Sequence, residues 1–110
     1  MIQLMPFKEM ARLNKLIHEP ARLAIMSALN ACTMAEFLFL QELTGLTKGN
    51  LSSHLSKLEK AGYILINKQF VRKKIPHTTI RITNEGKAAL HNYWEQLDRI
   101  REVTKKWQKD

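Results

Sequence analysis

Residues 44–66 read Thr-Gly-Leu-Thr-Lys-Gly-Asn-Leu-Ser-Ser-His-Leu-Ser-Lys-Leu-Glu-Lys-Ala-Gly-Tyr-Ile-Leu-Ile. Gly45 predicts a turn, and Thr47 stands where a helix N-cap belongs, because its hydroxyl can accept a hydrogen bond from an unpaired amide. At about 100° per residue, the recurring leucines share one helical face; they are Leu51, Leu55 and Leu58. Gly62 is placed to end the helix. Residues 44–62 therefore predict a tight turn followed by one amphipathic helix.

The face opposite the leucines is polar and cationic. It carries Gly49, Asn50, Ser53, Ser56, Lys57 and Lys60, with Ser52 and His54 on its flanks. Glu59 is the only acid in residues 44–66, and it lies beside the leucine face. Short hydrogen-bonding side chains can reach base edges in a DNA major groove, and lysines can meet phosphates. The alternative is an ordinary solvated helix face, but such faces are usually mixed in charge and rich in Glu.

Residues 63–83 predict a two-stranded hairpin. The sequence alternates from Ile64 onward, turns through the basic run 72–77, and alternates again with Ile80 and Ile82 on one side. After a helix-turn-helix, such a hairpin is a wing, whose cationic tip would lie along the DNA backbone or in the minor groove. The alternative is a solvated basic loop.

The last helix is predicted over residues 84–107, with Thr83 as its N-cap and Glu85 in its first turn. Apolar positions recur along it in alternating steps of three and four; they are Leu90, Tyr93, Leu97, Ile100, Thr104 and Trp107, and Trp94 and Val103 widen the stripe. This is the pattern of a helical packing seam. We interpret it as a dimer interface; the alternative, compatible with it, is packing on the chain's own residues 7–17.

The residues before position 44 predict further helices. An amphipathic helix is expected over 7–17, and a second from Pro20 to about Leu29, because proline suits a first helical turn. Arg22 could then meet a phosphate or be solvated. The apolar run 36–40 is expected to give one or two strand residues and a short helix that ends near Leu43. With the helix after Gly45, this makes a helix-turn-helix.

Composition agrees with a small nucleic-acid-binding protein. The 110 residues fit one domain, and the formal charge of +8 favours a polyanionic partner. No apolar run approaches the ~20 residues that span a bilayer, and the first residues lack a signal-peptide layout. We therefore expect a cytoplasmic protein. Its single cysteine, Cys32, permits no internal disulfide and is expected to be a buried small residue.

Several separated motifs resemble the small winged-helix transcription regulators of the MarR/ArsR type. The resemblance lies in residues 43–55, 58–64, 68–71, 76–79 and 82–86, and it covers roughly residues 20–93. It implies a homodimer on a pseudo-palindromic operator, with two recognition helices about 34 Å apart. The candidate DNA-binding residues on the recognition helix are Thr47, Lys48, Asn50, Ser52, Ser53, His54, Ser56 and Lys57. Those on the wing are Lys68, Arg72, Lys73, Lys74 and His77. Helical projection favours base reading for Asn50, Ser53 and Lys57, whereas His54 lies on the flank and could pack on a neighbouring helix instead.

Other functions receive less support from the sequence. The paired cysteines of metal-sensing relatives are absent, and the four histidines show no ligand spacing, so we expect no metal and no cofactor. No phosphate-binding glycine loop or nucleophile motif indicates an enzyme. An RNA-binding module would need an aromatic stacking platform. The alternatives kept open are a protein-binding module of a larger assembly and a nonspecific DNA-coating protein.

Overall fold

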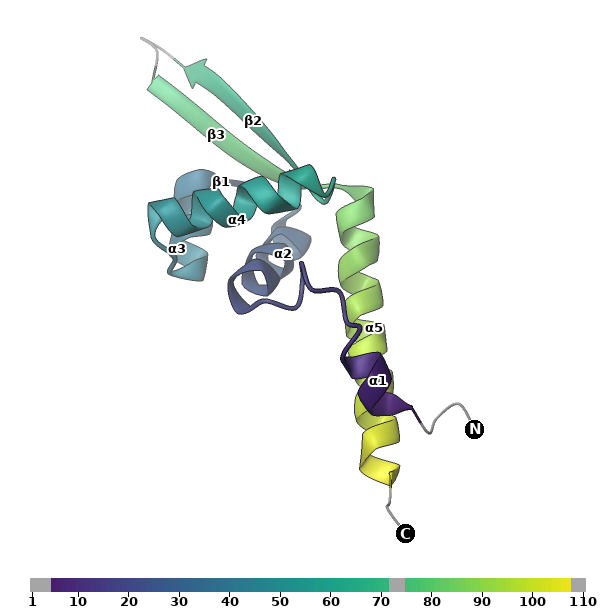
Figure 1. Cartoon of the computed structure of the whole chain (residues 1–110). Coiled ribbons are helices and arrows are strands. Elements are labelled where there is room, and N and C mark those ends of the chain that lie inside the picture. Colours follow the sequence, from purple (N-terminus) through teal and green to yellow (C-terminus); the bar gives the residue numbers. More distant parts are fainter. Residues whose placement is uncertain (1–4, 72–74, 108–110) are drawn as a thin grey trace.

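The computed structural model describes residues 5–71 and 75–107. Its elements, in chain order, are α1 (Pro6–Met10), α2 (Pro20–Cys32), β1 (Met34–Glu36), α3 (Phe37–Thr44), α4 (Lys48–Lys60), β2 (Ile64–Val71), β3 (Ile75–Ile82) and α5 (Asn84–Lys106). In Figure 1, α2, α3 and α4 gather at the base of the β2–β3 hairpin, and α5 runs away from them toward both termini. The predicted architecture is confirmed: mostly helical α+β, with a winged helix-turn-helix and a long C-terminal helix.

The helix-turn-helix begins and ends where its sequence predicts. Gly45 ends α3 with a φ of +69°, in the left-handed region that favours glycine. The Thr47 hydroxyl caps α4 by accepting a 3.2 Å hydrogen bond from the amide of Asn50. Gly62, at φ +81°, follows the last turn of α4, and its amide donates to the carbonyl of Glu59. Local backbone chemistry thus sets both ends of the motif.

The wing is part of a three-stranded antiparallel sheet in the order β1-β3-β2. Ile64 pairs with Ile82 and Ile66 with Ile80 across the hairpin. Because side chains alternate between the faces of a sheet, this register turns these isoleucines toward one side. Ile64, Ile80 and Ile82 are buried there, and the hairpin predicted over 63–83 is confirmed.

One apolar core joins the helices to the base of the wing. It contains Leu13, Ile17, Ile25, Met26, Leu29, Ala35, Leu40, Leu51, Leu55, Leu58, Ile64, Ile80, Ile82, Leu90, Tyr93 and Ile100. The predicted leucine face of α4 is buried in it. Each buried leucine contributes about 1.5–3 kcal/mol relative to an exposed one. These contacts hold α4 to the body and leave its opposite face to solvent.

The N-terminal segment differs from the prediction of one helix over 7–17, because α1 is short and turns follow it. In the later part of the segment, the side-chain oxygen of Asn14 accepts hydrogen bonds from the amides of Leu16 and Ile17 at 3.0 and 3.1 Å. Such a side chain offers the backbone an alternative to helical bonding. Leu13 and Ile17 are still buried, so the segment covers the core without being helical.

α2 begins at Pro20 as predicted but extends to Cys32 rather than ending near Leu29. Cys32 is exposed, which corrects the prediction that it is buried. It occupies the last position of α2, next to Thr33, whose φ of +69° turns the chain into β1. The cysteine therefore lies at the edge of the body, beyond the core.

α5 starts at the predicted N-cap. The Thr83 hydroxyl accepts a 3.0 Å hydrogen bond from the amide of Gly86 and donates a 2.7 Å bond to the carbonyl of Gly62. The Thr83 amide also donates to the carbonyl of Tyr63 at 3.0 Å. These bonds fasten the beginning of α5 to the end of α4.

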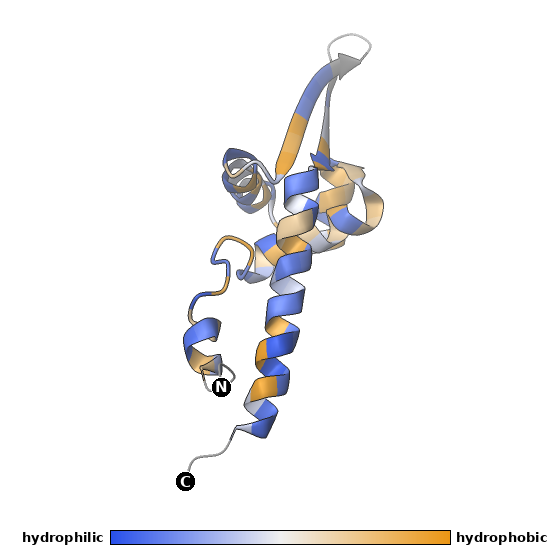
Figure 2. Cartoon of the chain, turned by 90° about the vertical axis from the view of Figure 1, so that its right-hand side faces the viewer, coloured by the Kyte–Doolittle hydropathy of each residue, from blue (hydrophilic) through white to orange (hydrophobic). Residues whose placement is uncertain are grey.

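More of the apolar stripe of α5 is buried within the single chain than the sequence predicts. Figure 2 shows hydrophobic residues recurring along α5 beside α1. Leu90, Tyr93 and Ile100 are at most 3% exposed within the single chain, so most of their surface is already covered by the chain itself, and their place in a dimer interface stays a prediction. Leu97 and Thr104 are half-buried. Helical spacing reveals an apolar stripe but does not reveal what covers it. In this chain the N-terminal segment and α2 cover it. Trp94 and Trp107 remain 41% exposed.

Candidate nucleic-acid interface

The face of α4 opposite the core is polar and exposed. Its exposed residues are Lys48, Gly49, Asn50, Ser52, Ser53, Ser56, Lys57 and Lys60. Glu59 is exposed as well and lines the groove beside the wing together with Ser52 and Ser56, whereas Asn50, Ser53, Lys57 and Lys60 form an acid-free strip along α4. The Thr47 side chain is exposed while its hydroxyl serves as the N-cap. A well-anchored helix with short donors and acceptors and terminal cations is suited to a major groove.

The wing stands beside one flank of α4. A groove of about 960 Å³ lies between α3, α4 and the wing. Lys48, Ser52 and Ser56 line it from α4, and Lys68 and His77 line it from the wing. Five predicted site residues from two distant stretches of sequence thus meet across one groove, which we call the α4–wing groove. The other wing candidates, Arg72, Lys73 and Lys74, lie outside the described residues.

Acidic side chains in the α4–wing groove were not predicted. Glu36, Glu42 and Glu59 line it. The Nε2 of His77 lies 3.3 Å from a carboxylate oxygen of Glu36, so this candidate phosphate ligand already faces an anion. No sequence signal links these residues, because Glu36 precedes α3 and His77 follows the wing tip. Because carboxylates repel phosphate, we expect the lysines of the groove to contact phosphate and the acidic α3 side of the groove to remain away from it.

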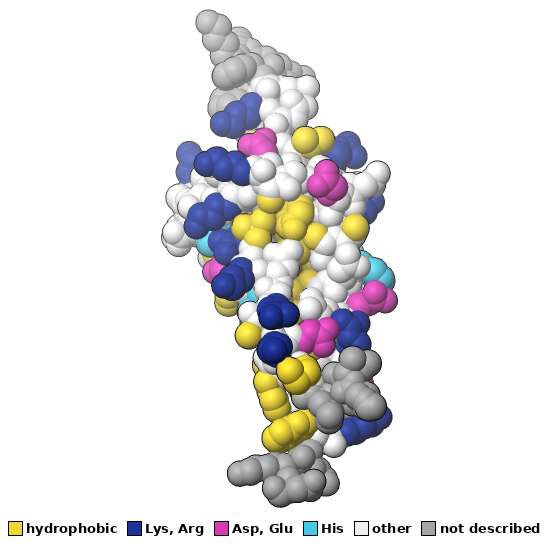
Figure 3. Space-filling view, turned by 45° about the vertical axis from the view of Figure 1, so that its right-hand side comes forward, with side chains coloured by type: hydrophobic (Ala, Val, Ile, Leu, Met, Phe, Trp, Pro, Cys, Tyr) yellow, Lys and Arg dark blue, Asp and Glu magenta, His cyan; other side chains and the backbone are white. Residues whose placement is uncertain are grey.

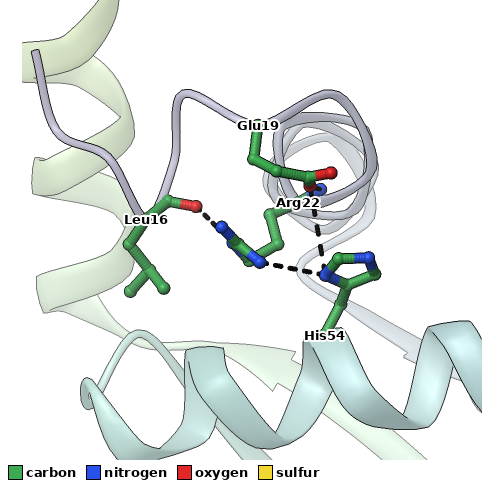
Figure 4. A network of polar contacts seen from close by, with 4 residues as sticks. All are labelled: Leu16, Glu19, Arg22 and His54. Carbon is green, nitrogen blue, oxygen red and sulfur yellow. Dashed lines mark hydrogen bonds and ion pairs between the residues drawn. The ribbon is translucent and has the colours of Figure 1, made fainter.

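His54 occupies a different environment from the other candidates on α4. Its side chain is 18% exposed and faces the start of α2. Its Nδ1 lies 3.1 Å from Nη1 of Arg22 and 4.0 Å from Oε1 of Glu19 (Figure 4). Direct DNA contact by His54 remains a prediction that competes with this internal role. Arg22 is likewise neither solvated nor outward-facing.

Glu19 is the N-cap of α2 and a member of the same group. Its Oε1 accepts a 2.7 Å hydrogen bond from the backbone amide of Arg22. This bond lowers the pKa of the Glu19 carboxyl, burial opposes the change, and the positive charge of the Arg22 side chain lowers the pKa further. The only sequence signal for this arrangement is the Glu19-Pro20 pair that opens the helix.

The face of the molecule drawn in Figure 3 is rich in cations. In Figure 3, lysine and arginine side chains are more prominent than acidic ones on the face in view, and hydrophobic side chains gather at mid-height and near the lower end. The sequence carries a formal charge of +8, and such an excess of cations favours polyanions.

Among residues 5–71 and 75–107, no group of three or more His, Cys, Asp or Glu side chains could hold a metal ion. In the same part of the chain, no helix combines the length and apolar character needed to cross a membrane.

The family model of the winged helix DNA-binding domain matches residues 21–101, from α2 to most of α5. The chain belongs to this family. An uncharacterised protein of Methanocaldococcus jannaschii is 37% identical to the winged-helix protein over 79 residues, which make up 72% of this chain and 85% of that protein.

Solved structures agree with the family. A structure of a transcriptional regulator homologue from Pyrococcus horikoshii OT3 has a TM-score of 0.78 and 30% identity, and the match covers 88% of this chain and 94% of that one. Wild-type MarR from E. coli in its apo form has a TM-score of 0.66 and 17% identity, with coverage of 99% and 84%. At that identity the likeness shows the fold alone, and the fold is the MarR-type winged helix predicted from the sequence.

Proposed function

We propose that the winged-helix protein is a homodimeric transcription regulator, acting as a repressor at a pseudo-palindromic operator. The observation that carries this proposal is the outer face of α4, where Asn50, Ser53, Lys57 and Lys60 form an exposed, acid-free strip on a helix that is fixed to the core by the leucines behind it. In the proposed complex α4 enters the major groove, where Asn50, Ser53 and Lys57 reach base edges. The proposal includes no catalytic step and no cofactor.

The wing supplies phosphate contacts in this proposal. Lys48 lines the α4–wing groove from α4, and Lys68 lines it from the wing. In the proposed complex, the DNA backbone beside the major groove would pass over this groove. Arg72, Lys73 and Lys74 follow Lys68 in the sequence and extend its charge. These contacts position the protein without reading sequence, and they make affinity depend on salt.

Exposed aromatic and sulfur side chains on α1 and along α5 support the dimer. Phe7, Met10, Trp94 and Trp107 are between 41% and 49% exposed. The rings of Phe7 and Trp107 meet edge to face with centroids 5.2 Å apart, which joins α1 to the end of α5. Phe7 and Trp107 thus form one exposed apolar contact surface, and exposed large apolar side chains mark interaction sites. A second copy seated there would place two α4 helices on one duplex.

A second candidate function has one observation in its favour. α3 exposes Leu38, Phe39 and Leu43, of which Leu38 is 72% exposed. This face would suit a protein partner of a larger assembly, in which DNA binding is weak or nonspecific. Leu38 and Phe39 line the α4–wing groove, whereas Asn50 and Ser53 do not, so substitutions at Asn50 and Ser53 distinguish the two functions.

We expect Asn50→Ala to reduce affinity for the preferred duplex by roughly tenfold to a hundredfold, because a lost base contact costs about 1–3 kcal/mol. Affinity for random DNA should change little. Fluorescence anisotropy with both duplexes measures the ratio. Asn92→Ala, an exposed asparagine on α5, is the matched control and should leave both affinities unchanged. An equal loss on both duplexes for Asn50→Ala would contradict base reading.

A further inference from the structure

The contact between α2 and α4 joins the recognition helix to the N-terminal segment through polar atoms (Figure 4). The Arg22 side chain makes two hydrogen bonds in different directions. Its Nε donates to the carbonyl of Leu16 at 2.5 Å, and its Nη1 contacts Nδ1 of His54 at 3.1 Å. Arg22 is itself at the start of α2, where Glu19 accepts from its backbone amide. One arginine therefore connects a loop, α2 and α4.

The chemistry of this contact defines which nitrogen of His54 is used. An arginine side chain only donates hydrogen bonds, so Nδ1 must act as the acceptor. In neutral imidazole the proton then resides on Nε2, the nitrogen that points away from Arg22 in Figure 4. His54 thus uses its inner nitrogen to hold α4 against α2.

The loop that anchors Arg22 is itself fixed at both ends. Asn14 donates to the hydroxyl of Tyr63 at 3.0 Å, just beyond the end of α4. His18 contacts the hydroxyl of Tyr93 on α5 at 2.7 Å. The carbonyl of Leu16 lies between these two attachments. Arg22 therefore links His54 to the Leu16 carbonyl, and the loop around Leu16 is hydrogen-bonded to the residues after α4 and to α5.

We propose that Arg22 is a positioning residue for DNA recognition, which holds α4 in its reading orientation through His54 without touching DNA. This inference rests on the proposed function of α4. The leucines behind α4 contribute non-directional packing, which tolerates small rotations of the helix. Sequence reading needs side chains within about 0.5 Å and 10–20° of the productive geometry. The Arg22–His54 hydrogen bond supplies the directional restraint that leucine packing lacks.

A double-mutant cycle on DNA affinity tests the proposal. Arg22→Ala, His54→Ala and the double variant are titrated against the selected duplex and against random DNA at several salt concentrations. We expect each single variant to lose roughly tenfold on the selected duplex, the double variant to lose no more than either, and the salt slope to stay unchanged. Additive losses, or a slope lowered by about one for His54→Ala, would overturn the proposal in favour of a phosphate contact.

Two conservative variants keep the test sharp if Arg22→Ala fails to fold. The side-chain oxygen of His54→Asn can occupy the position of Nδ1, whereas the polar end of His54→Gln corresponds to Nε2. The positioning role predicts that Asn retains most of the affinity for the selected duplex and that Gln loses roughly tenfold. Retention by Gln and loss by Asn would overturn it. Wild-type protein without any preferred duplex would overturn the proposed function as well, whereas additive losses in a sequence-specific protein would overturn the positioning role alone.

Discussion

Replacing Gly86 by alanine is expected to lower the free energy of unfolding by about 3 kcal/mol, because a Cβ there would collide with the backbone carbonyl oxygen of Tyr63. It would also lie 3.0 Å from Cγ1 of Ile82. The Tyr63 carbonyl cannot withdraw freely, since it accepts a hydrogen bond from the amide of Thr83. The first turn of α5 therefore packs against the start of the wing only when residue 86 lacks a side chain.

Gly49→Ala is the matched control for this substitution. A Cβ at Gly49 meets nothing within 4 Å, and the residue lies inside α4, where alanine is favoured over glycine. We expect it to raise the free energy of unfolding by roughly 0.5–1 kcal/mol. Urea unfolding followed by circular dichroism measures both variants. A Gly86→Ala protein as stable as wild type would contradict the close junction of α5 and the wing.

The double variant Trp94→Glu/Trp107→Glu is expected to be monomeric and to lose operator affinity by roughly a hundredfold or more. A dimer binds its second half-site as an intramolecular event, and a monomer loses this gain. Carboxylates at two exposed tryptophans would have to be desolvated in the proposed interface. Sedimentation velocity measures the oligomeric state, and anisotropy the affinity.

The choice of tryptophans follows from burial. Ile100 is buried within one chain and Leu97 half-buried, so charges there would unfold the monomer rather than separate two copies. Ala88→Glu/Asn92→Glu adds the same charge at exposed positions of α5 and should remain dimeric. A tryptophan double variant that sediments as a dimer would move the interface to another surface.

Local signals explain why the helix-turn-helix and the wing were predictable. Thr47, Gly62 and Thr83 act through bonds to residues within a few positions or through their own backbone conformation, so their roles can be read from the sequence. The alternation around Ile80 and Ile82 likewise reports one buried face directly.

Contacts between distant residues explain what the sequence did not reveal. The apolar stripe of α5 was visible, but not that the N-terminal segment and α2 cover much of it. Helical spacing predicts a helix at Asn14, because a spacing pattern does not reveal the side-chain bonds that Asn14 makes to nearby amides. In the candidate site, Glu36 meets His77 and Arg22 meets His54 only in the folded chain. Sequence periodicity predicts which face of a helix or strand is apolar, but only the tertiary structure shows which residues pack against that face.

The most direct test of the account is selection of bound duplexes from a randomised DNA pool by the purified protein at near-physiological salt. The account predicts a two-fold symmetric motif whose half-sites are about one helical turn apart, since two α4 helices would occupy successive major grooves. Recovery of no motif, with only weak and salt-sensitive binding, would contradict it and would favour nonspecific DNA coating or the protein-binding role of the exposed α3 face.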